Sequence, residues 1–172
     1  QYRYVGIDRT SECSILCIRS NAPKALRGVH WFAPASGPFN TAVALYANVK
    51  ELPAYLDTPT EVTTDSLYWN NRLVAGLSDP QFFESYEAIQ GYRLNTMAQG
   101  YQSLHETDAK LKLAAEGKAN LDDMDDPTVI AELERANQAL VDSVQTQTRA
   151  LLGTVLDQRT VTMKNAFNMN DH

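Results

Sequence analysis

The chain has 172 residues, of which 44% are hydrophobic and 21% are charged, a composition that fits one folded domain and excludes a disordered or fibrous segment. Fifteen Lys and Arg against 21 Asp and Glu give a formal net charge of -6, which argues against a nucleic-acid partner. No apolar run approaches the roughly 20 residues that cross a bilayer, so we predict no membrane span. The chain starts without an initiator Met or a secretory signal, and we expect it to be a segment of a longer protein.

The first 50 residues favour a β-sheet. Four segments have strand propensity, residues 3–7, 12–19, 27–34 and 41–49. Short turn-forming segments separate them, which predicts an antiparallel meander. Several strands contain adjacent apolar residues, as in Ile15-Leu16-Cys17-Ile18, and this pattern predicts that both faces of the sheet are covered.

From residue 64 onward the apolar period becomes helical. Thr64 or Asp65 is expected to cap a helix that runs through Leu77, and Asp79-Pro80 is expected to start a second helix of about 30 residues. The apolar stripe of that second helix comprises Phe82, Tyr86, Ile89, Met97, Tyr101, Leu104 and Leu111.

A linker at residues 116–126 separates this helix from a third. Asp126-Pro127 repeats the start signal, and the helix is expected to end near Asp157. Its heptad-like stripe comprises Ile130, Leu133, Asn137, Leu140, Val144, Leu151 and Val155. The two long helices are predicted to pair antiparallel. The fold class is therefore α+β, one domain over residues 1–172 with about four strands in residues 1–50 and mainly helices in residues 64–160.

The cysteines and histidines do not predict a redox or metal site. Cys13 and Cys17 lie about 13 Å apart along one strand, too far for a disulfide, and are expected to be reduced, buried small hydrophobes. His30 is expected to be a core histidine with one satisfied nitrogen. His105 begins a His-Glu-x-x-His pattern, but Ala109 stands where the second zinc ligand belongs. The acidic run at residues 122–126 lacks the spacing of a calcium loop.

Two polar residues near strand ends are candidates for a site. Arg9 carries a fork of donors that can bind a carboxylate or an oxyanion, and Asn40 can supply a neutral donor to a developing oxyanion. A turn Arg and a strand-capping Asn are the alternative interpretation, which spacing alone favours. Ser36 lacks the context of a nucleophile elbow, and the sequence contains no Gly-rich phosphate loop.

A series of short motifs resembles a known family. In chain order they are Ile7-Asp8-Arg9-Thr10, Ile15-Leu16-Cys17-Ile18-Arg19, Gly28-Val29-His30-Trp31-Phe32-Ala33, Gly37-Pro38-Phe39-Asn40, Tyr46-Ala47-Asn48-Val49, Tyr68-Trp69-Asn70-Asn71-Arg72-Leu73, Ala98-Gln99 and His105-Glu106-Thr107-Asp108. From about residue 2 to about residue 157 the chain resembles the C-terminal part of the bacterial dipeptidase A family, cysteine peptidases of the N-terminal-nucleophile hydrolase superfamily. Each motif is weak alone, and their order is fairly specific.

The resemblance implies an αββα sandwich in which an N-terminal Cys attacks the peptide carbonyl with its own amino group as the base. It implies hydrolysis of dipeptides without a metal or another cofactor. The sequence departs from the family where it matters most, because Gln1 cannot be the nucleophile. We therefore expect a C-terminal segment, inactive alone, with the nucleophile in a preceding N-terminal segment. Arg9 and then Asn40 are the supporting residues that the resemblance implies.

Two smaller departures concern the surroundings of these residues. Asp8 stands where similar proteins often carry Asn, and His30 stands where a neutral residue such as Gln is expected. A homo-oligomer in the cytoplasm is expected from the family and the reduced cysteines. Two alternatives stay open: a non-catalytic module whose helical hairpin binds a partner, and an amidase of the same fold that acts on a non-peptide amide.

Overall fold

The structure is a computed structural model that describes residues 10–115 and 120–163. The predicted strand at residues 3–7 and the candidate Arg9 lie outside these residues. The elements in chain order are β1 (Glu12–Ile18), η1 (Lys24–Leu26), β2 (Gly28–Pro34), η2 (Gly37–Phe39), β3 (Val43–Tyr46), η3 (Ala54–Leu56), α1 (Leu67–Ser78), η4 (Asp79–Gln81), α2 (Phe82–Ala115) and α3 (Pro127–Thr162).

The described strands form one antiparallel sheet in the order β1-β2-β3. In its register Ile15 lies opposite Trp31, and Trp31 lies opposite Ala44. The meander predicted over residues 12–49 is therefore confirmed, with a shorter last strand. Two long helices follow the sheet, which confirms the α+β class.

Helix α2 covers one face of the sheet at very close range. A Cβ added to Gly100 would lie 3.2 Å from the Ala44 Cβ and 3.2 Å from the Trp31 ring, so only Gly allows the helix to approach this closely. The Tyr46 hydroxyl donates to the Leu104 carbonyl of the same helix at 3.0 Å. Trp31, Ala44 and Tyr46 therefore face α2, and the residues between them along each strand face the other way.

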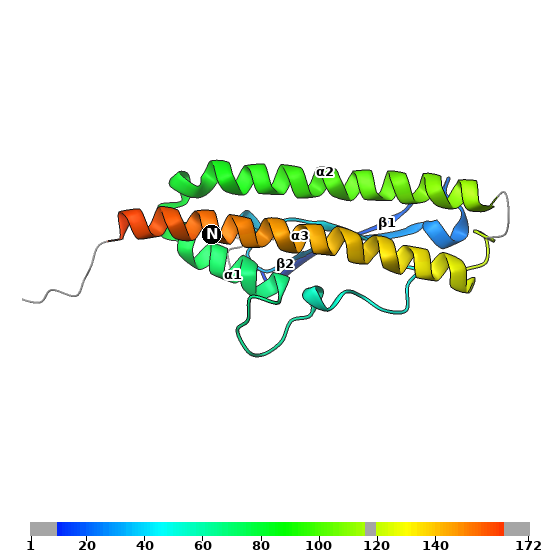
Figure 1. The fold of residues 1–172 in the computed structure, drawn as a ribbon, viewed down its shortest axis with the longest axis horizontal. Coiled ribbons are helices and arrows are strands. Elements are labelled where there is room, and N and C mark those ends of the chain that lie inside the picture. Colours follow the sequence, from blue (N-terminus) through cyan, green and yellow to red (C-terminus); the bar gives the residue numbers. More distant parts are fainter. Residues whose placement is uncertain (1–9, 116–119, 164–172) are drawn as a thin grey trace, which may run out of the picture.

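Helices α2 and α3 run side by side along the length of the molecule, as predicted (Figure 1). Asp126 caps α3, because its Oδ1 accepts from the backbone N–H groups of Thr128 and Val129, and Pro127 takes the first helical position. The predicted stripe of α3 is confirmed, since all seven of its residues are buried. The helix continues five residues past the predicted end, to Thr162.

Helix α1 begins at a different residue from the predicted caps. Its N-cap is Ser66, not Thr64 or Asp65. The Ser66 hydroxyl donates to the Asp57 carbonyl at 2.7 Å instead of capping its own helix, so a contact nine residues back along the chain fixes the helix start. The predicted restart at Asp79-Pro80 takes the form of the single turn η4, which leads directly into α2.

The predicted apolar stripe of α2 is partly wrong. Tyr86 and Tyr101 belong to it by spacing, yet they are 43% and 63% exposed. The buried face instead includes small and polar residues at helical spacing, among apolar ones: Ser85, Ile89, Tyr92, Thr96, Leu104, Thr107 and Leu111. Small side chains are needed here because the helix packs so closely on the sheet.

The free edge of β3 is closed by a side chain of α3. The Asn137 Oδ1 accepts from the Tyr46 N–H at 2.9 Å, and the Asn137 Nδ2 donates to the Tyr46 carbonyl at 3.1 Å. At Tyr46 an amide side chain thus makes both hydrogen bonds that a neighbouring strand would make there. Asn137 is 1% exposed and every residue of β3 is at most 3% exposed, so this edge is also closed to water.

The other edge of the sheet is open in the described part of the chain. Leu16 and Ile18 of β1 are 78% and 80% exposed, and Ile15 is 59% exposed. The prediction that both faces are covered is therefore wrong for β1 within residues 10–115 and 120–163. It rested on adjacent apolar residues, and these are present but lie at the surface.

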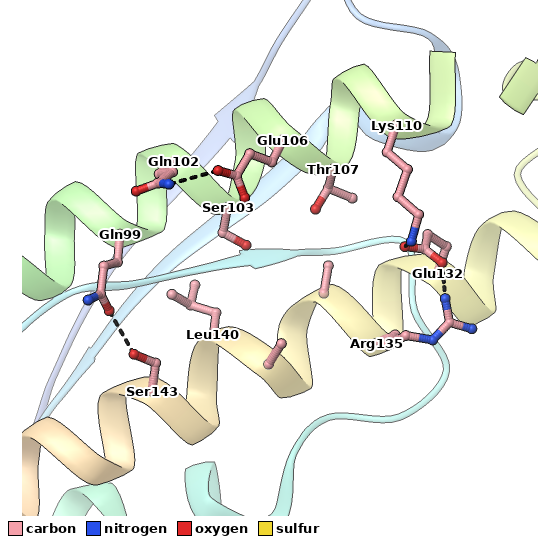
Figure 2. Close-up of a pocket in the computed structure, with 12 residues that line it drawn as sticks. Gln99, Gln102, Ser103, Glu106, Thr107, Lys110, Glu132, Arg135, Leu140 and Ser143 are labelled. Atoms are coloured by element: carbon pink, nitrogen blue, oxygen red, sulfur yellow. Dashed lines mark hydrogen bonds and ion pairs between the residues drawn. The ribbon is translucent and has the colours of Figure 1, made fainter. Parts of the chain in front are cut away.

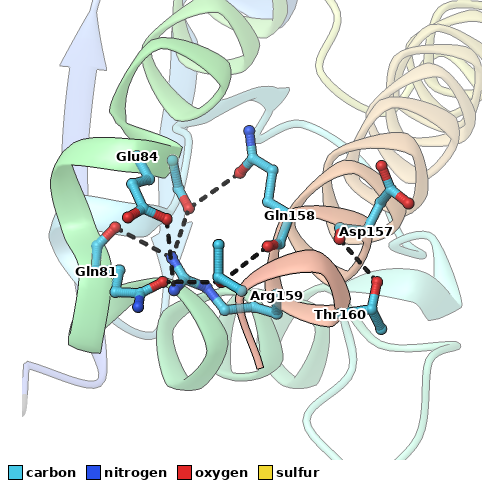
Figure 3. A network of polar contacts seen from close by, with 8 residues as sticks. Gln81, Glu84, Asp157, Gln158, Arg159 and Thr160 are labelled. Atoms are coloured by element: carbon cyan, nitrogen blue, oxygen red, sulfur yellow. Dashed lines mark hydrogen bonds and ion pairs between the residues drawn. The ribbon is translucent and has the colours of Figure 1, made fainter. Parts of the chain in front are cut away.

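The start of α2 and the end of α3 are joined by polar contacts around Arg159 (Figure 3). The Arg159 guanidinium donates to the Gln81 carbonyl at 3.1 Å and lies 3.9 Å from the Glu84 carboxylate. The Ser85 hydroxyl donates to the Gln158 side chain at 3.2 Å. These contacts hold the two helix ends together. Among the described residues, we find no helix with the length and apolar character of a membrane span.

Candidate functional site

The turn that follows β2 contains a backbone conformation that needs support. Ala35 has a φ of 62°, in the left-handed region that residues other than Gly rarely adopt. The Ala35 N–H donates to the Ser11 carbonyl at 2.7 Å, which ties the turn to the start of β1. A strained turn at a strand end, held by long-range contacts, is a common setting for functional groups.

Asn40 is the sequence-predicted candidate that the structure describes, and it lies in this turn. It follows η2, is 4% exposed, and donates from Nδ2 to the Pro34 carbonyl at 3.1 Å and to the Ala35 carbonyl at 2.7 Å. Both hydrogens of the amide nitrogen are therefore occupied by backbone carbonyls. Asn40 holds the chain around Ala35 in its left-handed conformation.

A second asparagine reaches the same turn from α1. The Asn71 Nδ2 donates to the Pro34 carbonyl at 2.9 Å, so this carbonyl accepts from two side chains. Asn71 is 1% exposed, and its Oδ1 has no hydrogen-bond partner. Asn71 is not among the site residues predicted from the sequence. The signal was present as two adjacent polar residues, Asn70 and Asn71, within a predicted helix, where polar pairs are normally exposed.

The next residue of α1 also contacts the turn. The Arg72 guanidinium lies 3.4 Å from the Ser36 hydroxyl, at the long end of hydrogen bonding. Ser36 is 3% exposed. Its place in the turn agrees with the prediction of a turn residue. A hollow of about 260 Å³ lies beside the turn, lined by Ser11, Glu12, Phe32, Pro34, Thr58 and Tyr68.

The cysteines and His30 are placed differently from the prediction. Both thiols are free. Cys17 is half-buried against the core, but Cys13 is exposed, so the prediction of a buried residue is wrong for Cys13. His30 lies on the face of the sheet that points away from α2 and is half-buried, so it is not a core histidine. One of its nitrogens is satisfied as predicted, because Nε2 lies 2.9 Å from the Ser14 hydroxyl.

A larger groove lies between α2 and α3 (Figure 2). It has a volume of about 480 Å³ and is lined mainly by polar side chains that bind one another. Glu132 pairs with both Lys110 and Arg135. Gln102 donates to Glu106 at 2.7 Å. Because opposite charges pair inside the groove, it offers no net charge to attract an ionic ligand.

Ser14 and His30 bring a hydroxyl and an imidazole into hydrogen-bond contact, but the Ser14 hydroxyl donates to the Glu12 carboxylate at 2.5 Å, so its proton is not held by the imidazole. Within residues 10–115 and 120–163 there is no group of three or more His, Cys, Asp or Glu side chains placed to hold a metal ion. What the turn around Ala35 offers is a rigid arrangement of backbone and amide groups at the end of a strand. It can position parts of a site.

Comparison with known proteins identifies the class. The sequence profile of Peptidase family C69 matches residues 1–95, more than half of the chain, and this range includes both β2 and the turn that follows it. The chain therefore belongs to peptidase family C69.

Related proteins align over almost the whole chain. It is 36% identical to a dipeptidase of Bifidobacterium longum (strain NCC 2705), over 99% of this chain and 37% of that protein. It is 37% identical to a probable dipeptidase A of Streptococcus pyogenes serotype M3, over 99% of this chain and 34% of that protein. It is 31% identical to dipeptidase A of Lactobacillus helveticus, over 91% and 31% respectively. The chain spans about a third of the length of these relatives.

Proposed function

We propose that this chain is the C-terminal segment of a cysteine dipeptidase. The observation that carries the proposal is the alignment of nearly the whole chain with dipeptidases of the C69 family. In the complete enzyme an N-terminal Cys, outside these residues, is the nucleophile. The three-stranded sheet is part of an αββα sandwich, and α2 and α3 form one of its outer layers.

In the proposed reaction the thiolate of the N-terminal Cys attacks the carbonyl carbon of the dipeptide. The free α-amino group of that Cys accepts the thiol proton and then donates it to the departing amine. Water hydrolyses the resulting thioester and releases the second amino acid. No metal is required for these steps. A chain without the nucleophile cannot perform them, so the 172 residues alone are expected to be inactive.

Arg9 and Asn40 are proposed as supporting residues of this reaction. The guanidinium of Arg9 orients the substrate carboxylate or the surroundings of the nucleophile. Asn40 acts as a positioning residue, a role supported by its two bonds to the carbonyls of Pro34 and Ala35, which leave no amide hydrogen for an oxyanion. Asn71 supports the same turn from α1.

Dipeptide hydrolysis by the full-length parent protein tests the proposal. The parent should release amino acids from dipeptides, and its variant with the N-terminal Cys changed to Ala should not. The 172-residue chain, assayed beside them, should be inactive. Arg9→Ala in the parent should lower turnover without unfolding the protein, and wild-type turnover in that variant would reject the role of Arg9.

The same assay separates the two other functions. A parent that is inert on dipeptides but hydrolyses simple acyl amides is an amidase of the same fold. A parent that is inert on both, and whose α2–α3 hairpin binds a partner, is an interaction module. The polar groove between α2 and α3 is the observation that favours an interaction module.

A further inference from the structure

Helix α1 presents two side chains to the turn around Ala35 from successive turns of the helix. Tyr68 and Arg72 are four residues apart, so they lie on the same face of α1. Tyr68 lines the hollow beside the turn, and the Arg72 guanidinium lies 3.4 Å from the Ser36 hydroxyl. The hollow and the guanidinium are therefore neighbours along the helix and along the turn.

The hollow has the size and the lining of a pocket for one amino-acid side chain. Its volume is about 260 Å³, below the roughly 300–1,000 Å³ of pockets that take drug-sized ligands. Phe32 and Pro34 alternate along β2, so they lie on the same face of the sheet, and with Tyr68 they supply an apolar lining. The Pro34 carbonyl is held by both Asn40 and Asn71.

The wall of the hollow opposite the sheet is also held by hydrogen bonds within the protein. Thr58, which lines the hollow, lies between two anchored carbonyls. The Asp57 carbonyl accepts from the Ser66 hydroxyl at 2.7 Å, and the Pro59 carbonyl accepts from the Trp69 Nε1 at 2.8 Å. A pocket whose walls are fixed before a ligand arrives binds that ligand at a lower entropic cost.

Two charged side chains flank the hollow at different residues of the turn. Arg72 is exposed, and no ion pair between described residues involves it. Its guanidinium carries five N–H donors in a fork that matches a carboxylate. Glu12 lies opposite Pro34 in the register, lines the hollow and is exposed, and its carboxylate accepts from the Ser14 hydroxyl at 2.5 Å.

We propose that this turn binds the C-terminal residue of the dipeptide, with the free carboxylate on the Arg72 guanidinium and the side chain in the hollow between Phe32 and Tyr68. The proposal rests on the proposed function, which supplies the substrate. It assigns the substrate carboxylate to Arg72 and leaves Arg9 for the surroundings of the nucleophile. Because like charges repel, Glu12 disfavours an acidic side chain in the hollow, so the favoured C-terminal residues are apolar.

Hydrolysis of a dipeptide and of its C-terminal amide by the full-length parent tests the role of Arg72. The parent should cleave alanyl-leucine with a kcat/KM about 10- to 100-fold above that for alanyl-leucine amide, because only the free carboxylate forms charge-assisted hydrogen bonds. Arg72→Gln should raise KM for alanyl-leucine to the level of the amide and leave kcat nearly unchanged. Arg72→Lys should restore part of the preference, since Lys keeps the charge but loses the fork.

Arg149→Gln is the matched control. Arg149 pairs with Asp65, just before α1, so this substitution affects the start of the same helix without touching the turn. It should keep the wild-type preference for the free carboxylate. A wild-type preference in Arg72→Gln would overturn the proposal, and so would equal cleavage of the two substrates by the parent. Loss of the preference in Arg9→Gln alone would assign the carboxylate to Arg9 and would also overturn it.

Substitutions in the hollow give an independent test. Thr58→Trp, at an exposed position of the wall, should lower kcat/KM for alanyl-leucine at least about 10-fold by filling the hollow, while alanyl-glycine is cleaved almost as before. Tyr68→Ala removes another wall and should reduce the preference for alanyl-leucine over alanyl-glycine. Changes in the urea midpoint of both variants without a change in this preference would mean that the hollow holds a side chain of the enzyme itself, which would overturn the proposal.

The binding site and the proposed function can fail separately. A parent that cleaves dipeptides, and whose variants at Arg72, Thr58 and Tyr68 all keep the wild-type preferences, retains the function and rejects the binding site. A parent that is inert on dipeptides rejects the function, and the binding site with it.

Discussion

The side chain of Asn137 and the backbone of Tyr46 form a reciprocal pair of hydrogen bonds that closes one edge of the sheet. The bonds are 2.9 and 3.1 Å long, and both groups are buried. An Asn inside an otherwise apolar helix stripe therefore has a specific partner. The Asn137 amide supplies to Tyr46 the two hydrogen bonds that a fourth strand would make at this residue.

Asn137→Leu should destabilise the fold by about 2–4 kcal/mol, because it keeps the volume but leaves the N–H and carbonyl of Tyr46 buried without partners. Urea unfolding followed by circular dichroism measures the change. Gln138→Leu, at the exposed neighbouring position, is the control and should change stability little. Equal effects of the two substitutions would show that the reciprocal bonds do not stabilise the edge.

Gly100→Ala should also destabilise the protein, by about 1–3 kcal/mol, because the new methyl group would lie 3.2 Å from both the Ala44 Cβ and the Trp31 ring. A Cβ added at Gly91 in the same helix would meet nothing within 4 Å. Gly91→Ala should therefore stabilise the protein by about 0.5–1 kcal/mol. Thermal unfolding should move the two midpoints in opposite directions. A rise for both would mean that α2 can shift away from the sheet.

Stability should fall above pH 10. Burial raises the pKa of Tyr92 above its ordinary value of about 10, so the hydroxyl stays protonated in the folded state while the same group ionises in the unfolded chain. The contribution of Tyr92 to the free energy of unfolding is fully present below pH 10. It is lost as the pH rises toward the folded pKa of Tyr92, at up to about 1.4 kcal/mol per pH unit.

Urea midpoints measured from pH 8 to pH 11 check this expectation. Tyr92→Phe should show a smaller decline over that range than the wild type. It should also be less stable at pH 8, because it loses the 2.7 Å hydrogen bond to Thr148. An identical decline in the two proteins would exclude Tyr92 as the source.

The carboxylate of Asp126 should stabilise the start of α3. Hydrogen bonds from the backbone of Asn120 and Thr128 lower the pKa of Asp126 in the folded state. The stability that the Asp126 carboxylate adds is therefore present above its unfolded pKa and is lost as the pH falls through the lower folded pKa. Asp126→Ala should lower the urea midpoint at pH 7, whereas Asp126→Asn should retain most of the cap. Asp125→Ala is the neighbouring control. Equal losses for Asp126→Ala and Asp125→Ala would reject the cap.

Local signals in the sequence predicted the elements well. Asp126-Pro127 marks a helix start by chemistry that needs only the next three residues, and the stripe from Ile130 to Val155 follows from side-chain spacing. The α1 start could not be predicted in this way, because Ser66 bonds to Asp57 through a tertiary contact. The buried face of α2 could not be predicted from the sequence either. Gly100 and Thr96 are buried there because the sheet lies so close to the helix.

The candidate site was predictable only in part. Asn40 is identifiable as a polar residue between two strands, and the structure places it in a buried turn. Its bonds to the carbonyls of Pro34 and Ala35 depend on the left-handed Ala35, which no sequence pattern indicates. The contribution of Asn71 depends on the packing of α1 against this turn, a contact 37 residues apart in sequence.

The pairing of Tyr46 with Asn137 spans 91 residues, and this distance affects how the protein is made. A ribosome adds about 5–20 residues per second, so Tyr46 waits on the order of 5–20 s for the segment that completes its hydrogen bonds. During that interval the backbone of Tyr46 at the β3 edge has no partner. At this edge the danger of aggregation through strand pairing is therefore concentrated in synthesis, before the last helix has emerged.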